Sequence, residues 1–260
     1  MISNIRQLYK ARELIWAWAF RTVRVRYKQS VLGGLWAVIV PITSVAIFSI
    51  IFTYFIPVDT GGTPYLVFSY TAMVPWTFFS ASITDMVVSI VGNMNLVGKI
   101  YFPREVLPFS AIIARLVDFA IAFSILILLI IVYRVEIYIL GWLLIPFIVL
   151  TQMALSLGIG LAGSALNVFY RDINHLIALG IQLWFYATPI IYPVSSVPPK
   201  YLPLYYLNPM AGVIEAYRSI ILYHQLPGPY FLISVAVALI SFTIGYIIFK
   251  RFEFQFADVV

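Results

Sequence analysis

An uncharged run of sequence, VLGGLWAVIVPITSVAIFSIIFTYFI at residues 31–56, decides the fold. About 18 to 20 consecutive apolar residues are enough for a helix to cross the roughly 30 Å hydrocarbon core of a bilayer. This run is longer than that, and it is also too long for the hydrophobic part of a cleavable signal peptide. Since the strongly basic segment 1–28 precedes it, we interpret 31–56 as a first permanent membrane span.

The composition extends this interpretation to the whole chain. Of its 260 residues, 63% are hydrophobic and only 10% are charged, whereas soluble domains are about half apolar and a quarter charged. We therefore predict an all-α polytopic membrane protein that forms a single transmembrane domain over residues 1–260. Its six spans are expected at about 31–56, 65–91, 106–133, 139–168, 176–195 and 230–249.

The residue types that support catalysis are scarce. Cysteine is absent, which excludes a disulfide framework and thiolate metal sites. The two histidines, His175 and His224, fall on opposite sides of the predicted membrane, and no acidic cluster has the spacing of metal ligands. The sequence therefore predicts no catalytic or metal site. The net charge of +6 is interpreted by position and not as a sign of nucleic-acid binding.

Lysine and arginine predict the orientation, because they concentrate on the cytoplasmic side of membrane proteins. One side of the predicted membrane carries Arg6, Lys10, Arg12, Arg21, Arg24, Arg26, Lys28, Lys99, Arg104, Arg171, Lys250 and Arg251. The other side carries only Arg134, Lys200 and Arg218. Both termini are therefore expected in the cytoplasm.

The segment before the first span, residues 1–30, mixes aromatic with basic side chains. Arg21, Arg24 and Lys28 share one helix face, and tryptophans at 16 and 18 accompany them. This composition is typical of an amphipathic helix that lies in the membrane interface. Its plainest role is to anchor and orient the chain.

The stretch NMNLVGKIYFPREVLP, residues 93–108, lies between the second and third spans. It is not a phosphate-binding loop, because five residues separate its glycines where four are needed, and Ile100 replaces the hydroxyl residue. Leu96, Val97, Ile100 and Tyr101 would share one face of a short amphipathic helix. From periodicity alone, an ordinary surface loop is favoured over this helix.

Charged residues inside the third span need partners. Arg115 and Asp118 are three residues apart on one helix face, and Arg115 is about 14 Å from the expected helix start at 1.5 Å per residue. Because an unpaired charge at such a depth is costly, we expect an intramembrane ion pair or the lining of a polar pathway. Asp85, near the cytoplasmic end of the second span, is expected to reach the interface.

Three further features have alternative interpretations. Small residues recur every four positions in ALSLGIGLAGSA, 154–165, which favours close helix packing within the chain or at a subunit interface. PMAGVIEAYRSIIL, 209–222, with Asn208 as a possible cap, is too short to span and is expected to be re-entrant within the loop 196–229. The clustered aromatic residues are either packing and membrane-belt residues or the lining of a channel for sugar rings: Trp76, Phe78, Phe79, Trp184, Phe185 and Tyr186.

Six stretches spread over nearly the whole chain carry a resemblance to a known family. They are VRYKQSVLGGLWAVIVP (25–41), VPWTFF (74–79), NLVGKIYFPREVLP (95–108), VFYRDINHL (168–176), ATPIIYP (187–193) and LNPMAGVIEAYR (207–218). In these stretches and their order, the chain resembles the membrane (permease) subunits of polysaccharide-exporting ABC transporters. This group includes the O-antigen (Wzm-type) and teichoic acid export permeases.

The resemblance implies an architecture and partners. Such permeases have six transmembrane helices, an N-terminal interface helix and gate helices between spans five and six, here 196–229. They act as homodimers that dock on two copies of a separate ATPase subunit, which binds ATP and Mg. Residues 94–102 match the coupling helix, although Gly98 stands where relatives often carry a charged or bulky residue. The coupling residues implied are Asn95, Leu96, Val97, Gly98, Lys99, Ile100, Tyr101, Arg104 and Glu105.

The resemblance also implies a function, namely export of a lipid-linked, O-antigen-like polysaccharide across a bacterial cytoplasmic (inner) membrane. The chain itself would hold no cofactor and would not be an enzyme; its further partners would be membrane lipids. Arg21, Arg24, Arg26 and Lys28 are candidates for the site where the lipid pyrophosphate enters, although attraction to anionic lipid headgroups is the simpler account of them.

Rival interpretations remain at this stage. A secondary transporter or channel would favour an internal repeat, and a membrane enzyme acting on polyprenyl-linked sugars would favour clustered acids or histidines; neither pattern is visible. A drug- or other-substrate-exporting ABC permease is a further alternative.

Overall fold

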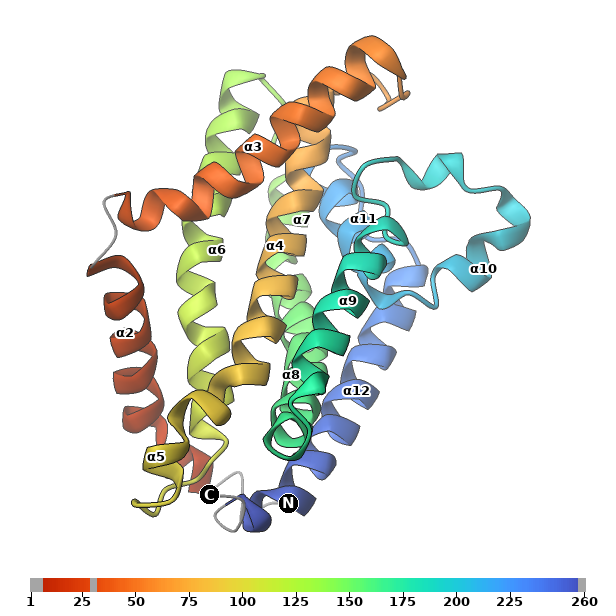
Figure 1. Cartoon of the computed structure of the whole chain (residues 1–260). Coiled ribbons are helices and arrows are strands. Elements are labelled where there is room, and N and C mark those ends of the chain that lie inside the picture. Colours follow the sequence, from red (N-terminus) through yellow and green to blue (C-terminus); the bar gives the residue numbers. More distant parts are fainter. Residues whose placement is uncertain (1–6, 29–31, 257–260) are drawn as a thin grey trace.

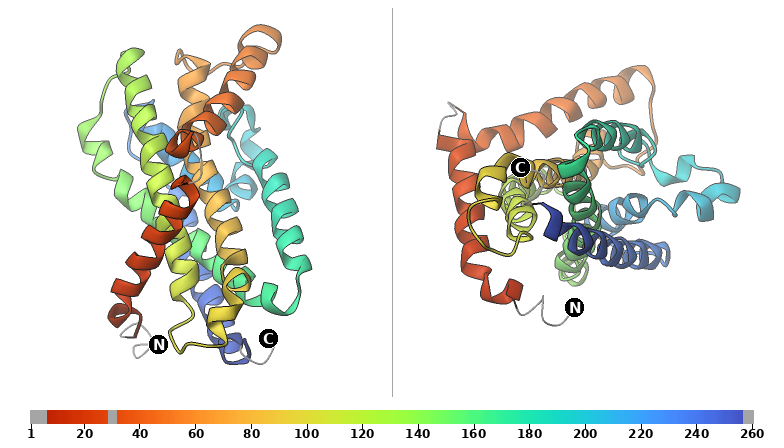
Figure 2. Two further views of the ribbon diagram at one scale, coloured as in Figure 1. Left: turned by 60° about the vertical axis from the view of Figure 1, so that its left-hand side comes forward. Right: turned by 60° about the horizontal axis from the view of Figure 1, so that its bottom comes forward.

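The computed structural model describes residues 7–28 and 32–256, and over these ranges it is built from helices and connecting segments, without a β-strand (Figures 1 and 2). The principal helices are α2 (Arg12–Lys28), α3 (Trp36–Ile50), α4 (Tyr65–Ser89), α5 (Met94–Val97), α6 (Val106–Val132), α7 (Ile139–Trp142), α8 (Ile145–Phe169), α9 (Asp172–Tyr186), α10 (Leu202–Tyr205), α11 (Pro209–Ile221) and α12 (Tyr230–Phe252). Short helical turns at Gly33–Leu35, Ile51–Phe55, Val91–Asn93, Val194–Ser196, Pro199–Tyr201 and Glu253–Gln255 extend or connect them.

Five helical stretches among the described residues are long and apolar enough to cross a membrane. They are Gly33–Phe55, Tyr65–Ser89, Val106–Val132, Ile139–Phe169 and Tyr230–Gln255. Each coincides with one of the spans expected from the sequence, and the protein is therefore an integral membrane protein. The expected start of the first span, Val31, lies outside the described residues. So do both chain termini and residues 1–6 and 29–30 of the expected interface helix.

The remaining expected span, 176–195, differs from the structure. Its helix, α9, starts earlier at Asp172 and ends at Tyr186, which gives 15 residues and a length of about 22 Å at 1.5 Å per residue. The following segment contains Pro189 and Pro193 and has no regular helix, because proline supplies no backbone N–H and disfavours helical geometry in the residue before it.

The core surrounds α4, which lies among α3, α6, α8, α9 and α11. Of the most apolar 18-residue window of α4, 78% of the residues are buried. The small residues of α8 pack inside the chain on both sides of that helix. A Cβ added to Gly245 of α12 would lie 1.9 Å from the carbonyl oxygen of Gly158, and one on Gly160 would lie 2.4 Å from Met86 of α4. The spacing of small residues therefore serves intramolecular packing here.

Helix α2 packs lengthwise against α6 (Figures 1 and 2). Its buried residues are Ile15 and Ala19, while Trp16 and Phe20 on the outward side are 65% and 63% exposed. The helix thus presents Ile15 and Ala19 to the bundle and Trp16 and Phe20 away from it, as a helix in contact with lipid would do.

The segment expected to form a helix over 94–102 is helical only at α5, Met94–Val97, after a tight turn at Val91–Asn93. Gly98 follows as the C-terminal cap residue. Pro103 contributes to this difference, since it disfavours helical geometry at Phe102 and cannot donate a backbone hydrogen bond. The predicted two-turn helix is therefore a single turn followed by an irregular segment up to Glu105.

Helix α11 lies at the other end of the bundle from α5 and is inserted between α12, α4 and α8 (Figure 1). Twelve of its thirteen residues are buried, all except Glu215. Asn208 caps it as expected, accepting a hydrogen bond from the backbone N–H of Met210 at 3.0 Å. A short, almost wholly buried helix of this kind has its polar backbone satisfied by protein and not by solvent.

Candidate functional site

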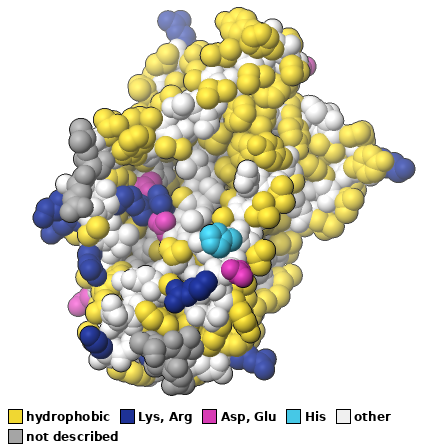
Figure 3. All heavy atoms as spheres, viewed as in Figure 1, with side chains coloured by type: hydrophobic (Ala, Val, Ile, Leu, Met, Phe, Trp, Pro, Cys, Tyr) yellow, Lys and Arg dark blue, Asp and Glu magenta, His cyan; other side chains and the backbone are white. Residues whose placement is uncertain are grey.

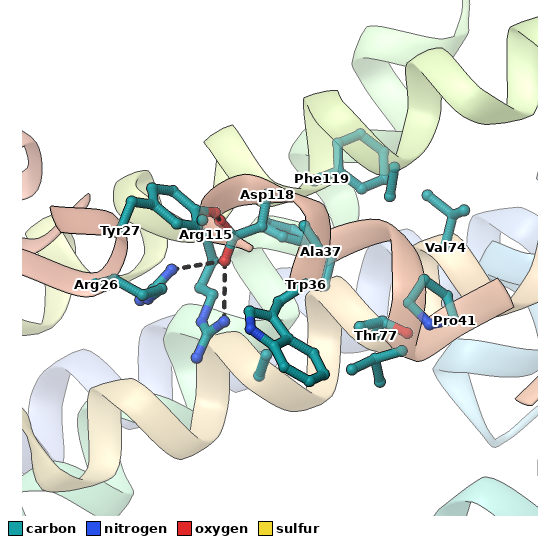
Figure 4. A pocket seen from close by; sticks show the side chains of 15 residues that line it. Arg26, Tyr27, Trp36, Ala37, Pro41, Val74, Thr77, Arg115, Asp118 and Phe119 are labelled. Carbon is teal, nitrogen blue, oxygen red and sulfur yellow. Dashed lines mark hydrogen bonds and ion pairs between the residues drawn. The ribbon is translucent and has the colours of Figure 1, made fainter. Parts of the chain in front are cut away.

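Four charged side chains from three helices form a charge quartet. Arg26 of α2 and Arg115 of α6 face Asp85 of α4 and Asp118 of α6. Each arginine binds both carboxylates: Arg26 at 2.8 Å to Asp85 and 2.6 Å to Asp118, and Arg115 at 2.7 and 2.9 Å. Figure 4 shows Arg26, from α2, and Arg115, from the same helix as Asp118, both pointing toward the Asp118 carboxylate. The alternating arrangement cancels two positive against two negative charges.

The quartet is only partly exposed, since its side chains retain between 14% and 26% of their accessible surface. Charges withdrawn from water in this way are tolerated when they are paired and hydrogen-bonded. Tyr27 completes the arrangement by donating from its hydroxyl to Oδ1 of Asp118. Burial and this hydrogen bond to Asp118 raise the pKa of Tyr27 to about 12, so its hydroxyl remains a donor at physiological pH.

This geometry changes two expectations. Arg26 was expected among the residues that receive a lipid pyrophosphate, but its guanidinium is occupied by two carboxylates of the chain itself. Asp85 was expected to reach the interface, but it accepts from both arginines. Arg115 and Asp118, the pair expected from their spacing, do lie together, within this larger group.

Two cavities flank the quartet. A cavity of about 270 Å³ lies between α3, α4 and α6, and mostly apolar side chains such as Trp36, Pro41 and Phe119 line it beyond the charged end (Figure 4). A second cavity of about 420 Å³ lies toward α5 and is lined by Trp18 and Arg21 of α2 and by Asn93, among others. Arg26 borders both cavities, so the quartet separates an apolar cavity from a more polar one.

The other basic residues of α2 are more accessible than Arg26. Arg21, Arg24 and Lys28 are exposed; Arg21 lies over the Trp18 ring at 4.8 Å and Arg24 over the Phe20 ring at 5.0 Å. On the face seen in Figure 3, most charged side chains gather over the half of the molecule that holds α2 and α5, while hydrophobic side chains cover much of the opposite half. The α5 half therefore has the composition expected of a surface that meets water and lipid headgroups.

The segment around α5 is divided between buried and exposed residues. Val97 is 1% exposed, whereas Ile100 and Tyr101 are 57% and 94% exposed. Leu96 and Ile100 border an apolar pocket of about 110 Å³ against Trp18 of α2 and neighbouring residues. The expected single apolar face is therefore absent, because the helix ends before Ile100. Asn95, Gly98 and Lys99 are exposed.

Arg104 and Glu105 tie this segment to the end of α12. The Arg104 guanidinium donates to the carbonyl of Val97 at 3.3 Å and to that of Glu253 at 3.1 Å. Glu105 is 1% exposed and pairs with Lys250, which also binds Glu253 at 2.8 Å. A displacement of α5 is thus connected directly to the end of the last helix.

The candidate channel aromatics pack mostly against one another. Trp76 contacts Phe185 at 5.7 Å between ring centroids, and Phe79 contacts Trp184 at 5.3 Å. Phe78, which also borders the apolar cavity, meets the Phe119 ring at 5.2 Å. The three candidates on α4, Trp76, Phe78 and Phe79, are at most 5% exposed, and Tyr186 is the most exposed of the six at 62%. Within one chain, most of these rings build the core and line no open path.

Sequence reasoning missed the partners of this site that are distant in the chain. Asp85 and Tyr27 join the quartet across 30 to 91 residues of sequence, so helix periodicity gives no signal for them. The available signal was that arginines withdrawn from water need compensating acceptors. No cluster of three or more potential metal ligands is present among residues 7–28 and 32–256.

These features define a class: a helical membrane protein with paired internal charges and a small, structured surface between its second and third spans. Comparison with known proteins identifies the class further. The sequence profile of the ABC-2 type transporter family matches residues 13–222, and the chain belongs to that family. It is accordingly a transport protein of the permease type.

Individual relatives cover nearly the whole chain. An O-antigen export system permease protein RfbA from Klebsiella pneumoniae is 32% identical, with 92% of each chain covered. A protein of the same name from Myxococcus xanthus is 28% identical over the full length of both chains. The polysialic acid transport protein KpsM of Escherichia coli is 27% identical over 78% of each chain.

Proposed function

We propose that this chain is the membrane subunit of an ATP-driven exporter that moves a lipid-linked, O-antigen-like polysaccharide across the bacterial inner membrane. The observation that carries the proposal is the similarity to O-antigen export permeases over 92% of both chains. KpsM, whose name also concerns a polysaccharide, supports the same substrate class. A drug-exporting permease is the second candidate, but none of these relatives favours it.

The proposed topology has six crossings with both termini in the cytoplasm. In it, α9 and the segment after it together make the fifth crossing, and α11 is re-entrant within the gate region 196–229. The position of α5 and the end of α12 at one end of the bundle, and of α11 toward the other, supports this arrangement (Figure 1). The exposed arginines of α2 lie in the α5 half, as the preference of basic residues for the cytoplasmic side requires.

The proposed assembly is a homodimer with two ATPase subunits, which bind ATP and Mg. One chain fills its own core, so a conduit for a glycan needs a second copy. Helix α9 supports this requirement because none of its residues is buried. Its apolar outward row of Leu176, Leu179, Leu183 and Tyr186 is between 53% and 62% exposed.

The proposed coupling site is the segment Asn95–Tyr101 with Arg104 and Glu105. Closure of the ATPase subunits would press on the exposed residues Ile100 and Tyr101. Arg104 and Glu105 would pass the displacement to α12 through their contacts with Lys250 and Glu253.

The proposed site for the pyrophosphate of the lipid carrier is the exposed basic face of α2, Arg21, Arg24 and Lys28, next to the more polar cavity. Arg26 is not part of it as a free cation, since it belongs to the charge quartet. Replacing the three exposed residues by glutamine should reduce stimulation of the ATPase by substrate. Unchanged stimulation would leave them only a role in membrane attachment.

The experiment that tests the function is complementation. The chain and a matching ATPase subunit are produced in a strain whose own O-antigen exporter genes are deleted but whose glycan synthesis is intact. Antibody staining of intact cells should show polysaccharide restored to the surface, and an ATPase variant unable to hydrolyse ATP should abolish it. Failure of restoration with an assembled, ATP-hydrolysing complex and a matched glycan would overturn the proposal.

A further inference from the structure

The segment that follows α9, Ala187–Pro193, has no regular helix, yet each of its first six backbone carbonyls accepts a hydrogen bond. The carbonyl of Thr188 accepts from the N–H of Ile190 at 2.7 Å. The carbonyls of Ala187, Pro189, Ile190, Ile191 and Tyr192 accept from side chains. Since buried backbone groups without partners are rare in folded proteins, this non-helical path is specified by the residues that supply the donors.

Arg218 of α11 supplies most of these donors. Its Nη1 donates to the carbonyl of Pro189 at 2.6 Å and to that of Tyr192 at 3.3 Å, and its Nη2 donates to that of Ile190 at 2.9 Å. The Arg218 side chain is fully buried, and its guanidinium lies 3.7 Å from the centre of the Phe68 ring of α4. A planar fork with several fixed donors is suited to neighbouring carbonyls in a way that the single ammonium of lysine is not.

Asn208, at the start of the same helix, holds the other end of the segment. It accepts from the indole N–H of Trp184 at 2.7 Å, and its amide donates to the carbonyl of Ala187 at 3.1 Å and to the hydroxyl of Thr188 at 3.0 Å. The same carboxamide oxygen caps α11. One side chain therefore connects the end of α9 to the beginning of α11.

Tyr65, in the first turn of α4, closes the set by donating from its hydroxyl to the carbonyl of Ile191 at 2.7 Å. The stretches 187–193 and 207–218 are thus one physical unit: the second supplies most of the donors and the first supplies the acceptors. The side chain of Ile190, in the middle of the segment, is fully buried beneath this network.

We propose that Arg218 and Asn208 are positioning residues for export, which latch the segment Ala187–Pro193 onto α11 in the resting state and release it during each transport cycle. The proposal rests on the proposed function, since α9 and this segment there form the fifth crossing beside the second copy of the chain. Movement of α9 away from α11 requires the carbonyls to leave their side-chain donors. Because the donors sit on a buried helix, the segment in this proposed cycle is either held by them or free of them.

The absence of cysteine from the chain makes the latch directly measurable. Ile190→Cys places a single thiol under the network, and its rate of reaction with a water-soluble maleimide is measured on this chain in complexes with the ATPase subunit in nanodiscs. The resting complex should react slowly, and ATP with the glycan substrate should accelerate the reaction, because turnover opens the latch. An equal rate with and without turnover would overturn the proposal.

Arg218→Lys keeps the charge but loses the planar guanidinium. Combined with Ile190→Cys, it should make the thiol react about tenfold faster or more without ATP, as loss of hydrogen bonds from a charged donor predicts. Tyr65→Phe removes only the bond to Ile191 and should give a smaller increase. Lys200→Met, which removes an exposed charge from the same loop region, is the matched control and should react as slowly as the parent.

Folding is checked by size-exclusion chromatography and by assembly with the ATPase subunit. If Arg218→Lys does not fold, Tyr65→Phe and Asn208→Ser carry the comparison, because each removes a smaller part of the network. A folded, assembled variant whose thiol reacts at the parent's rate would refute the latch. Polysaccharide export by the unmodified chain is measured separately, so loss of the latch and loss of the proposed function are distinguishable outcomes.

Discussion

Replacement of Arg26 by glutamine should destabilise the protein far more than the same replacement at Arg24, two residues earlier in α2. Arg26 makes hydrogen-bonded ion pairs with two carboxylates at 2.6 and 2.8 Å, with a side chain 24% exposed. Arg24 is exposed and contacts a phenylalanine ring at 5.0 Å. The two variants remove the same charge from the same helix, so their difference isolates the quartet.

The magnitude follows from the exposure. Exposed ion pairs contribute about 0 to 1 kcal/mol, and removing one partner of a fully buried pair costs about 3 to 5 kcal/mol. The quartet lies between these limits, and its two carboxylates would be left with one arginine. We therefore expect Arg26→Gln to cost about 2 kcal/mol and Arg24→Gln less than about 0.5 kcal/mol.

Thermal unfolding of the detergent-purified chain, followed by circular dichroism, measures the difference. A loss of about 2 kcal/mol corresponds to roughly 4 to 8 °C in Tm for a chain of this size. Adding Asp118→Asn to Arg26→Gln leaves one arginine facing one carboxylate, so the double variant should lose about 1 kcal/mol less than the sum of the single changes. Equal Tm values for the two arginine variants, or strict additivity of the double variant, would refute the quartet as a stabilising unit.

Three further outcomes are expected. Gly245→Ala should abolish or severely reduce the yield of folded protein, because its Cβ would lie 1.9 Å from a backbone oxygen. Gly180→Ala, whose added Cβ would have nothing within 4 Å, should fold normally on size-exclusion chromatography. Equal yields of the two variants would contradict the packing described. Tyr101→Ala should leave Tm unchanged, since this side chain is 94% exposed. In a binding titration with the ATPase subunit it should weaken assembly by about 5- to 30-fold, the range of an interface anchor. Tyr54→Ala, a change at an exposed residue near the end of α3, should bind normally in the same titration. The pKa of Tyr27 is raised to about 12 in the folded chain, so its hydroxyl is neutral in both folded and unfolded chains well below about pH 10. Tyr27→Phe should therefore leave the pH dependence of Tm between pH 6 and 9 unchanged. It should reduce only the loss of stability between pH 10 and 12.

The sequence predicted the membrane spans because hydropathy is a local property and the lipid core imposes one length on every crossing. Local spacing likewise brought Arg115 and Asp118 together. The extent of α9 and α5 was overestimated because hydrophobic periodicity continues through positions where proline and glycine change the backbone. The prolines of ATPIIYP and the pair of Gly98 and Pro103 were visible in the sequence, but their effect on helix length depends on which neighbours supply hydrogen bonds.

Contacts between distant helices could not be predicted in this way. Arg26 is 59 residues from Asp85 and 92 from Asp118. Its sequence neighbours are basic and aromatic residues, so the sequence suggested that it binds the lipid pyrophosphate. Arg218 appeared only as one of few basic residues on the far side of the membrane. Each role is defined by acceptors that come from a distant part of the chain, and a single sequence carries no direct record of them.

Both polar assemblies are anchored in the same helix. Asp85, near one end of α4, belongs to the charge quartet, and Tyr65, in the first turn at the other end, belongs to the latch on the segment after α9. Between these ends α4 is packed against α6, α8 and α11, so it offers little freedom to move.

The two polar assemblies attach helices to α4 that are far less buried than α4 itself. In α2 only Ile15 and Ala19 are buried, and α9 has no buried residue. Apolar packing holds the centre together without directional bonds, whereas the two peripheral elements are held by hydrogen bonds and ion pairs of fixed geometry, which are either made or broken. Since transport needs a few discrete arrangements, we expect α2 and α9 to move against a largely unchanged α4, α8 and α12, and we expect the two polar assemblies to determine when they do.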